Sequence, residues 1–157
     1  MIPKDGDLSE SKKWRPIALL SILYKAFAKL VYNRISLVLS SRQSWDQHGF
    51  TPGVRIEDAL LCAGVSIEHY QDFNLQLWVL SIDMRKAFDT IDHNSLIEAL
   101  RSRELPEPYV ALIQLLYTNQ SGTANNSKEF KIQRGVKQGD CLSSVLFNCV
   151  LDIAFEN

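Results

Sequence analysis

The stretch Leu75–Asp92, LQLWVLSIDMRKAFDTID, decides the fold that this sequence predicts. Its first part, residues 75–83, is an apolar run of strand length, rich in residue types that suit a pleated sheet. It therefore predicts a buried central strand. Alternation along that strand puts Asp83 on the same face as Leu77 and Val79. A carboxylate at the end of a buried strand is costly unless a cation or a hydrogen-bond donor meets it.

Three carboxylates lie in or directly after this run: Asp83, Asp89 and Asp92. Two interpretations of Asp83 are open. Mg²⁺ is commonly held by one or two carboxylates together with the phosphates of its substrate, so Asp83 could be a metal ligand. Alternatively, Asp83 only caps the turn that leaves the strand, and this short stretch alone favours that simpler role. The other motifs of the chain favour the metal ligand.

Length and composition indicate one globular domain with a core, since the chain has 157 residues, 46% of them hydrophobic and 22% charged. The net charge of −1 gives no global sign of a nucleic-acid-binding protein, so such a surface must be local. Residues 11–34 contain several basic side chains and no acidic one. Lys12, Lys13 and Arg15 are clustered where they could meet phosphate. Lys25, Lys29 and Arg34 fit a solvated helix face equally well.

The cysteines and the apolar stretches indicate the cellular compartment of the protein. Cys62, Cys141 and Cys149 form no CxxC pair, which argues against a structural zinc site or a disulfide framework and favours a reducing compartment. The start, MIPKDGDLSE, has no apolar core of a secretory signal. No apolar stretch reaches membrane-spanning length. These observations predict an intracellular protein of the cytoplasm, the nucleus or both.

Apolar spacing and turn residues divide the rest of the chain. Helices are predicted from Pro16 to about residue 38, over 56–70, from a capping box at Ser95 and Glu98, over 110–117, and over 142–153. Two short strands meet in a predicted hairpin around Asn125–Asn126. SWDQHGFTPG (44–53) and RGVKQGD (134–140) are predicted loops.

Four blocks stand in a fixed order: KWRPIALLSILYKAFAKLVYNRI (13–35), QHGFTPG (47–53), SIDMRKAFDTIDH (81–93) and RGVKQGDCLSSVLFNCVLD (134–152). Together they resemble the reverse transcriptase domain of non-LTR (LINE-type) retrotransposons, and more distantly that of group II introns, from about Trp14 to Asp152. The third and fourth blocks are the specific ones, because D-x-x-x-A-F-D followed by R-G-V-x-Q-G-D rarely arises by chance. QHGF alone would be weak evidence.

The resemblance implies an α+β fold, with helices packed on a small antiparallel sheet. It divides the chain into a loose polar N-terminus (1–13), fingers (14–73) and a partial palm (74–157). It also implies an RNA-directed DNA polymerase, which transfers nucleotides from deoxynucleoside triphosphates to a DNA primer 3′-hydroxyl along an RNA template. Two divalent ions, Mg²⁺ or alternatively Mn²⁺, stabilise the attacking and leaving oxygens in such a reaction.

The resemblance assigns roles to individual residues. Asp83 and the backbone carbonyl of Met84 match metal ligands, and Phe88 matches the residue under the sugar, where a bulky ring excludes a 2′-hydroxyl. Simple core packing is the alternative for Phe88. The remaining matches are Arg15 for the triphosphate, Gln138 and Gly139 for the nucleotide and template, and Lys12, Lys13 and Arg55 as possible phosphate contacts. Close backbone approach or a positive φ would explain Gly139. We expect Asp83, Arg15 and Gln138 to share one cleft.

The sequence departs from the family pattern in three ways. Thr51 stands where the family usually has an arginine, and Arg55 is either its displaced substitute or unrelated. The helix after QGD begins Cys141-Leu142-Ser143-Ser144 instead of P-L-S-P. The aromatic-x-Asp-Asp turn, which supplies two more metal-binding carboxylates and should follow Asp152, is absent, as are the rest of the palm and the thumb.

These departures predict a polymerase fragment that is inactive as an isolated chain. The alternative is a non-enzymatic fragment of a decayed or co-opted retroelement that retains residual nucleic-acid binding. An unrelated magnesium enzyme with a single carboxylate is a third possibility, but it gives no account of QGD.

Overall fold

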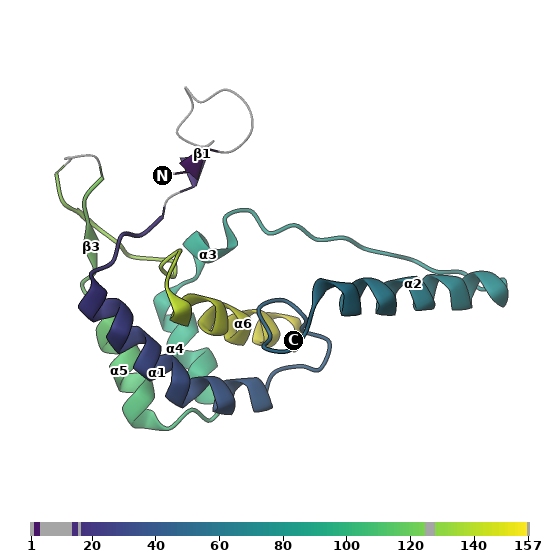
Figure 1. Cartoon of the computed structure of the whole chain (residues 1–157), viewed down its shortest axis with the longest axis horizontal. Coiled ribbons are helices and arrows are strands. Elements are labelled where there is room, and N and C mark those ends of the chain that lie inside the picture. Colours follow the sequence, from purple (N-terminus) through teal and green to yellow (C-terminus); the bar gives the residue numbers. More distant parts are fainter. Residues whose placement is uncertain (1, 4–13, 16, 125–127, 157) are drawn as a thin grey trace.

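The computed structural model describes residues 2–3, 14–15, 17–124 and 128–156, which are mainly helical (Figure 1). The elements in chain order are β1 (Ile2–Pro3), β2 (Trp14–Arg15), α1 (Ile22–Ser41), α2 (Ile56–Asp72), α3 (Ala87–Thr90), α4 (His93–Ser102), α5 (Glu107–Tyr117), β3 (Ser121–Gly122), β4 (Phe130–Lys131) and α6 (Cys141–Glu156). None of the helices in these ranges combines the length and the apolar character needed to cross a membrane.

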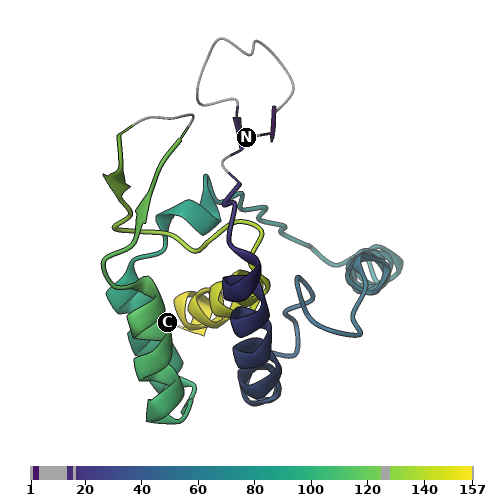
Figure 2. The same cartoon turned by 60° about the vertical axis from the view of Figure 1, so that its left-hand side comes forward.

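Four helices form the core of the molecule. Helix α6 packs against both α1 and α4, and α4 packs against α5, so α6 crosses between α1 and the α4–α5 pair (Figure 2). The largest fully buried apolar side chains come from all four helices: Ile35, Leu96, Leu100, Val110, Ile113, Leu142 and Leu146. The predicted inward face of the last helix is confirmed, because Leu142, Leu146 and Cys149 are buried and Ile153 packs against the core. Burial of these side chains is the main force that holds the four helices together.

The predicted helix after Pro16 exists but begins later. The hydroxyl of Ser21 accepts the backbone N–H of Tyr24 at 3.2 Å and caps α1, which starts at Ile22. Residues 17–21 belong to no helix or strand, and Ser21 itself has an extended backbone. A serine side chain that accepts an N–H of the first turn sets the start of a helix more strongly than the apolar spacing that led us to begin it at Pro16.

Two other helix starts also differ from the prediction. Helix α4 is capped by Asp92, whose carboxylate accepts the backbone N–H groups of Asn94 and Ser95 at 2.9 and 3.1 Å. Ser95 is therefore a donor inside the first turn and not the cap. Helix α5 begins at Glu107, with Pro108 in its first turn, where the missing N–H sacrifices no hydrogen bond within the helix.

The predicted antiparallel pairing is present in short form. Strands β3 and β4 pair with Ser121 facing Lys131 and Gly122 facing Phe130, on either side of Asn125–Asn126, as the predicted hairpin requires; Asn125 and Asn126 lie outside the described residues. Strands β1 and β2 form a second antiparallel pair. Among the described residues, the main packing contacts of the four core helices are with one another. The expected α+β fold is thus confirmed only as a mixture of helices with small two-stranded antiparallel sheets.

The predicted buried central strand at residues 75–83 is wrong. The segment is extended but pairs with no strand in the described part of the chain. Its apolar side chains face solvent, with Trp78 90% and Leu80 83% exposed. Strand-forming residues need a neighbouring strand for their backbone groups and an apolar surface for their side chains. The described residues offer this segment neither of these.

The predicted helix over 56–70 is confirmed as α2, but it buries none of its residues. It stands apart from the four-helix core, and the extended segment leads from its C-terminal end back to α3 (Figure 1). We call residues 54–85 the arm. Its exposed large apolar side chains lie along both the helix and the extended segment: Val54, Ile56, Leu60, Leu61, Val65, Ile67, Phe73, Leu75, Leu77, Trp78, Val79, Leu80, Ile82 and Met84.

Candidate functional site

Three segments that are far apart in the sequence meet beside the start of α6. Residues 134–138 run along residues 88–92, with the N–H of Gly135 donating to Ile91 O and that of Val136 donating to Phe88 O, both at 2.8 Å. On the other side, the N–H of Ala18 donates to Gln138 O at 3.1 Å. We call the meeting of residues 17–18, 86–92 and 134–140 the motif junction. It joins three of the four blocks that carry the family resemblance.

Gly135 allows the two longest of these segments to approach closely. Its φ is +90°, and a Cβ atom at this position would lie 2.9 Å from both Cα and the carbonyl oxygen of Asp89. Real side chains avoid such contacts with backbone atoms. Residue 135 must therefore be glycine for the RGV segment to lie against the AFD segment.

The carboxylates around the junction have different partners. Asp89 Oδ1 accepts a hydrogen bond from the Gln138 amide nitrogen at 2.7 Å. Asp92 caps α4, and the backbone N–H groups of Ser95 and Asn94 hold the pKa of its carboxyl below the usual value. Of the three carboxylates in and after the 75–83 segment, Asp89 and Asp92 are thus hydrogen-bonded within the protein.

Asp83 and Met84 lie at the end of the arm, and both are exposed. In the described ranges, no group of three or more His, Cys, Asp or Glu side chains could hold a metal ion. Asp83 is thus a single exposed carboxylate, and two ions in an in-line geometry need more ligands than it can supply. The described residues therefore do not make a complete divalent-metal site.

Phe88 belongs to a cluster of three rings. It stacks on Phe147 of α6 with ring centroids 4.6 Å apart and planes inclined by 12°. The ring of Phe50, from the QHGF loop, meets it edge-on at 5.6 Å. Phe88 itself is half-buried against the core. Phe88 therefore does pack against the core, as the simpler interpretation expected. Its contact with the sugar of a nucleotide stays a prediction.

Gly139 is explained by its backbone conformation. Its φ is +98°, and a Cβ atom added here would meet its nearest neighbours, Ile17 Cγ2 and Ala18 O, at ordinary contact distances of 3.7 and 3.9 Å. Two reasons were expected for this glycine, close backbone approach and a positive φ. The φ value confirms the second, and the described residues do not approach closely enough to require the first.

The predicted phosphate contacts are placed only in part. Lys12 and Lys13 lie outside the described residues, and for Arg15 only the backbone is described, in β2, three residues before Ala18. Arg55 is exposed at the start of α2, where its backbone N–H donates to Asp58 Oδ2 at 2.8 Å. The backbone at Ala18, three residues after Arg15, thus lies against the loop of Gln138. Asp83 and Arg55 lie elsewhere, at the two ends of the arm.

A cluster that the sequence did not reveal attaches the QGD loop to α1. The hydroxyl of Tyr24 donates to Asp140 Oδ2 at 3.0 Å, and Lys137 Nζ donates to that hydroxyl at 2.9 Å. The same ammonium lies 4.2 Å from the centroid of the Tyr24 ring. Burial raises the pKa of Tyr24 and lowers that of Lys137. The only signal in the sequence was a tyrosine on a helix face that is otherwise apolar.

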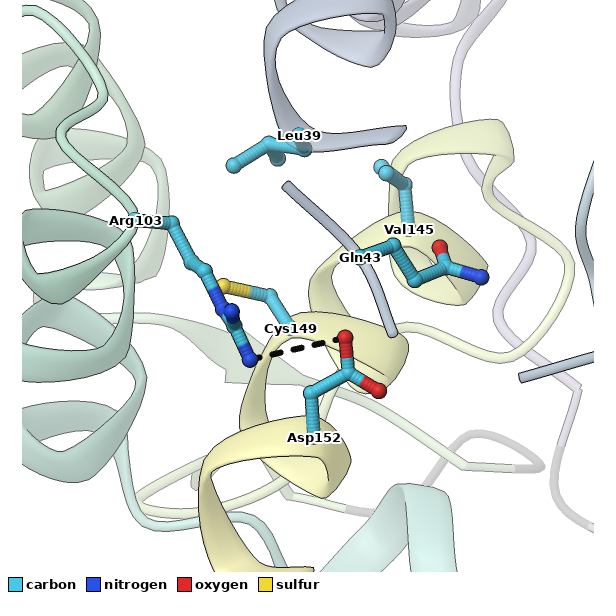
Figure 3. A pocket seen from close by; sticks show the side chains of 6 residues that line it. All are labelled: Leu39, Gln43, Arg103, Val145, Cys149 and Asp152. Atoms are coloured by element: carbon cyan, nitrogen blue, oxygen red, sulfur yellow. Dashed lines mark ion pairs between the residues drawn. The ribbon is translucent and has the colours of Figure 1, made fainter. Parts of the chain in front are cut away.

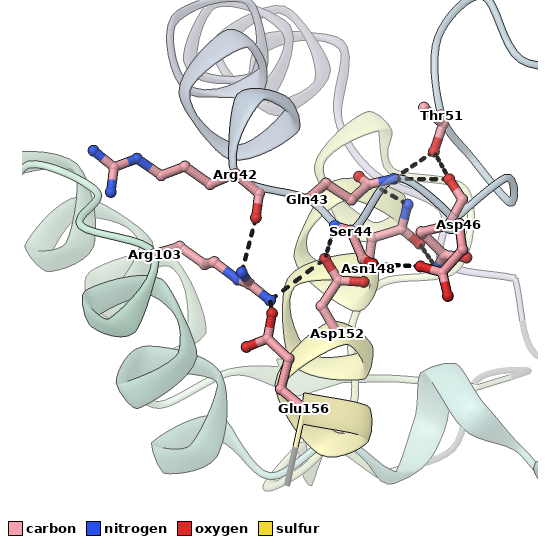
Figure 4. A network of polar contacts seen from close by, with 10 residues as sticks. Arg42, Gln43, Ser44, Asp46, Thr51, Arg103, Asn148, Asp152 and Glu156 are labelled. Atoms are coloured by element: carbon pink, nitrogen blue, oxygen red, sulfur yellow. Dashed lines mark hydrogen bonds and ion pairs between the residues drawn. The ribbon is translucent and has the colours of Figure 1, made fainter.

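A second polar cluster holds the QHGF loop on α6 (Figure 4). Asn148, which is buried, donates to Gly49 O at 2.8 Å and accepts from the Gln47 side chain at 3.3 Å. The hydroxyl of Thr51 donates to Gln47 O at 2.7 Å. Thr51, where the family usually has arginine, therefore stabilises the loop, and Asn148 fixes the turn that carries Phe50.

Arg103 joins the end of this cluster to the α4–α5 turn. Its guanidinium donates to Arg42 O at 2.8 Å and pairs with Glu156 at 2.7 Å and Asp152 at 3.5 Å. The pKa of the Asp152 carboxyl is nevertheless raised. Burial raises this pKa by more than the N–H of Ser44 and the charge of Arg103 lower it. The polar residues Asn148, Asp152 and Glu156 recur every four residues, and this spacing was the overlooked sequence signal.

Arg103 and five neighbouring residues line a pocket that is too small to admit a water molecule (Figure 3): Leu39, Gln43, Val145, Cys149 and Asp152. Burial raises the pKa of the Cys149 thiol to about 12, so the thiol stays protonated and unreactive at neutral pH. The pocket is a packed part of the core and offers no place for a ligand.

Comparison with known proteins identifies the family. Residues 2–157 match the family described as reverse transcriptase (RNA-dependent DNA polymerase). The chain belongs to the reverse transcriptase family. Its expected resemblance to non-LTR retrotransposon enzymes is confirmed by the relatives described next.

The reverse transcriptase segment is 34% identical to a retrovirus-related Pol polyprotein from the type-1 retrotransposable element R2 of Popillia japonica, over 97% of the chain and 22% of the relative. It is 32% identical to that of the type-2 element R2DM of Drosophila melanogaster, over 96% and 14%. The transposon TX1 uncharacterized 149 kDa protein of Xenopus laevis is 33% identical, over 97% and 12%. The chain thus spans less than a quarter of the length of each of these relatives.

Proposed function

We propose that this chain is the part of a retrotransposon RNA-directed DNA polymerase that holds the incoming deoxynucleoside triphosphate against an RNA template and a DNA primer. The motif junction carries the proposal. It brings the AFD segment, the QGD loop and the backbone next to Arg15 together, and these are the segments to which the family resemblance assigns the nucleotide. The remaining palm and the thumb would be supplied by residues outside this chain.

In this proposal the side chains keep the roles that the resemblance gives them. Phe88 lies under the sugar, Gln138 and Gly139 lie against the nucleotide and template, and Arg15 meets the triphosphate. Lys12, Lys13 and Arg55 are further phosphate contacts, with the fingers over 14–73 and the palm from residue 74. A ring that is stacked on Phe147 and held edge-on by Phe50 has little freedom to move away from a 2′-hydroxyl.

The cofactor in this proposal is a pair of divalent ions, Mg²⁺ or Mn²⁺. Asp83 and the carbonyl of Met84 would be two of their ligands, together with carboxylates from outside the 157 residues. Because the described residues do not complete such a site, the isolated chain is expected to bind nucleotide without extending a primer. Robust template-directed incorporation by the purified chain would contradict this part of the proposal.

The test is the preference of the chain for a deoxyribose over a ribose nucleotide. Equilibrium binding of dTTP and of its ribose counterpart with the same base, ribothymidine triphosphate (rTTP), is measured by calorimetry with the unmodified chain, Phe88→Ala and Phe155→Ala. Phe155 is an exposed ring near the end of α6 and serves as the matched control. Tighter binding of dTTP by the unmodified chain and Phe155→Ala, with the preference lost in Phe88→Ala, supports the proposal.

Two results would contradict the proposal. Binding of neither nucleotide would remove the nucleotide site. Binding of single-stranded RNA without any preference between dTTP and rTTP would favour the alternative, a non-enzymatic retroelement fragment with residual nucleic-acid binding. An unchanged preference in Phe88→Ala would remove the role of Phe88 alone.

A further inference from the structure

We infer that Asp89 is a positioning residue for Gln138, and that it turns the carbonyl oxygen of the Gln138 side chain toward a hydroxyl or amino donor of the bound nucleotide or template. The inference rests on the proposed function for the identity of the ligand. The positioning itself rests only on the geometry of the motif junction. Asp89 is the last residue of the AFD motif and Gln138 is the first of QGD, so their hydrogen bond joins the two most specific motifs of the chain.

The hydrogen bond between these residues fixes which end of the amide faces the protein. Gln138 Nε2 lies 2.7 Å from Asp89 Oδ1, and both side chains are half-buried. An ionised carboxylate only accepts hydrogen bonds, whereas an amide side chain has one donating and one accepting end. The NH₂ group must therefore face Asp89. The reversed amide would place two acceptor oxygens against each other.

The backbone on both sides of Gln138 is fixed as well. Its carbonyl accepts the N–H of Ala18 at 3.1 Å. Before it, Lys137 is attached to Tyr24, and after Gly139, the carboxylate of Asp140 accepts from the same hydroxyl. Asp89 is fixed in turn, because Gly135 lies directly on its backbone. The Asp89–Gln138 hydrogen bond therefore joins two anchored backbones, and the orientation of the amide is set before any ligand arrives.

This orientation has a chemical consequence. Among the hydrogen bonds of the described residues, none is donated to Gln138 Oε1, and the residue is not fully buried. The oxygen is thus available as an acceptor with a defined direction. A site built in this way selects ligands that present an O–H or N–H at that point, because a ligand without the donor would leave the oxygen unsatisfied.

The positioning can be tested without a ligand by NMR of the side-chain amides. In the unmodified chain, the Gln138 NH₂ protons should be shifted from the usual glutamine position and exchange slowly with solvent. Asp89→Ala should return them to that position, and Asp89→Asn, which keeps an acceptor oxygen, should retain part of the shift. Gln114, whose side chain is exposed, and the variant Asp72→Ala are the controls. A Gln138 signal that is the same in the unmodified chain and in both Asp89 variants would overturn the inference.

The second arm is a double-mutant cycle on dTTP binding. Asp89→Ala and Gln138→Ala should each weaken binding by about tenfold, the effect of losing one well-directed hydrogen bond between the ligand and the neutral Gln138 amide. Asp89→Ala should have no further effect once Gln138 is alanine, because Asp89 acts through Gln138. Independent, additive effects would overturn the positioning role even if dTTP binds. If dTTP does not bind at all, the proposed function fails and the amide signal still decides the positioning.

Discussion

Replacing Gly135 by alanine tests the close approach on which the motif junction depends. Two costs follow from the structure. A left-handed backbone costs a residue with a side chain about 1–2 kcal/mol. The new Cβ would also lie 2.9 Å from backbone atoms of Asp89, so the loop must move away.

Moving the loop weakens the hydrogen bonds that Gly135 and Val136 donate to Ile91 and Phe88, each worth about 1 kcal/mol. We therefore expect Gly135→Ala to lower the free energy of unfolding by about 3–4 kcal/mol, a large fraction of the stability of a typical domain.

Gly53→Ala is the matched control. Gly53 also has a positive φ, +82°, but no atom lies within 4 Å of the position of its Cβ. It should lose only the backbone contribution of about 1–2 kcal/mol. Urea-induced unfolding followed by far-ultraviolet circular dichroism measures both variants against the unmodified chain. Equal losses would show that close packing on Asp89 does not select glycine at residue 135.

Three further predictions concern other parts of the chain. Gly64→Ala removes a helix-interior glycine that has no neighbour, so it should stabilise α2 by about 1 kcal/mol and raise amide protection in residues 56–72 only; slower exchange in α6 as well would contradict a local effect. Asn148→Ala leaves Gly49 O without its donor and should cost about 1–3 kcal/mol in urea unfolding, and no loss would show that the contact is dispensable. Because burial raises the pKa of Asp152 above its ordinary value of 3.8, the folded chain holds that proton more tightly than the unfolded chain. The stability that this carboxyl contributes is present below pH 3.8 and is lost as the pH rises through the raised pKa. Over that pH window the unmodified chain should therefore lose stability relative to Asp152→Asn, as measured by urea unfolding at each pH. A stability difference between the two chains that does not change with pH would contradict this prediction.

The helical part of the fold was the most predictable from the sequence, because each core helix carries its own apolar periodicity. The helix starts were less predictable, since Ser21 and Asp92 act as caps through hydrogen bonds that several nearby polar residues could have made. The strand at residues 75–83 could not be settled from local pattern. An apolar extended segment becomes a buried strand only when a partner strand is present, and its partner is not encoded within the segment.

The candidate site was predictable in its motifs and not in its contacts. Gln138 and Gly139 stood out as letters of QGD, but nothing in the sequence pairs Gln138 with Asp89, which lies 49 positions away. The role of Tyr24 was hidden for the same reason, because its partners Lys137 and Asp140 follow more than one hundred positions later. Contacts over such separations depend on how the helices pack, which periodicity does not specify.

The arm is a position at which the polypeptide could be cut into two fragments that still bind each other. Residues 54–85 separate α1 from α4, α5 and α6, and α2 buries no side chain. The contact between α1 and α6, by contrast, joins the two sides of the arm through buried residues such as Ile35 and Leu146. A cut within the arm would break the covalent link and leave that interface in place. Two peptides divided there should reassemble as a complementing pair, with an affinity that measures how strongly α1 is held by the rest of the core.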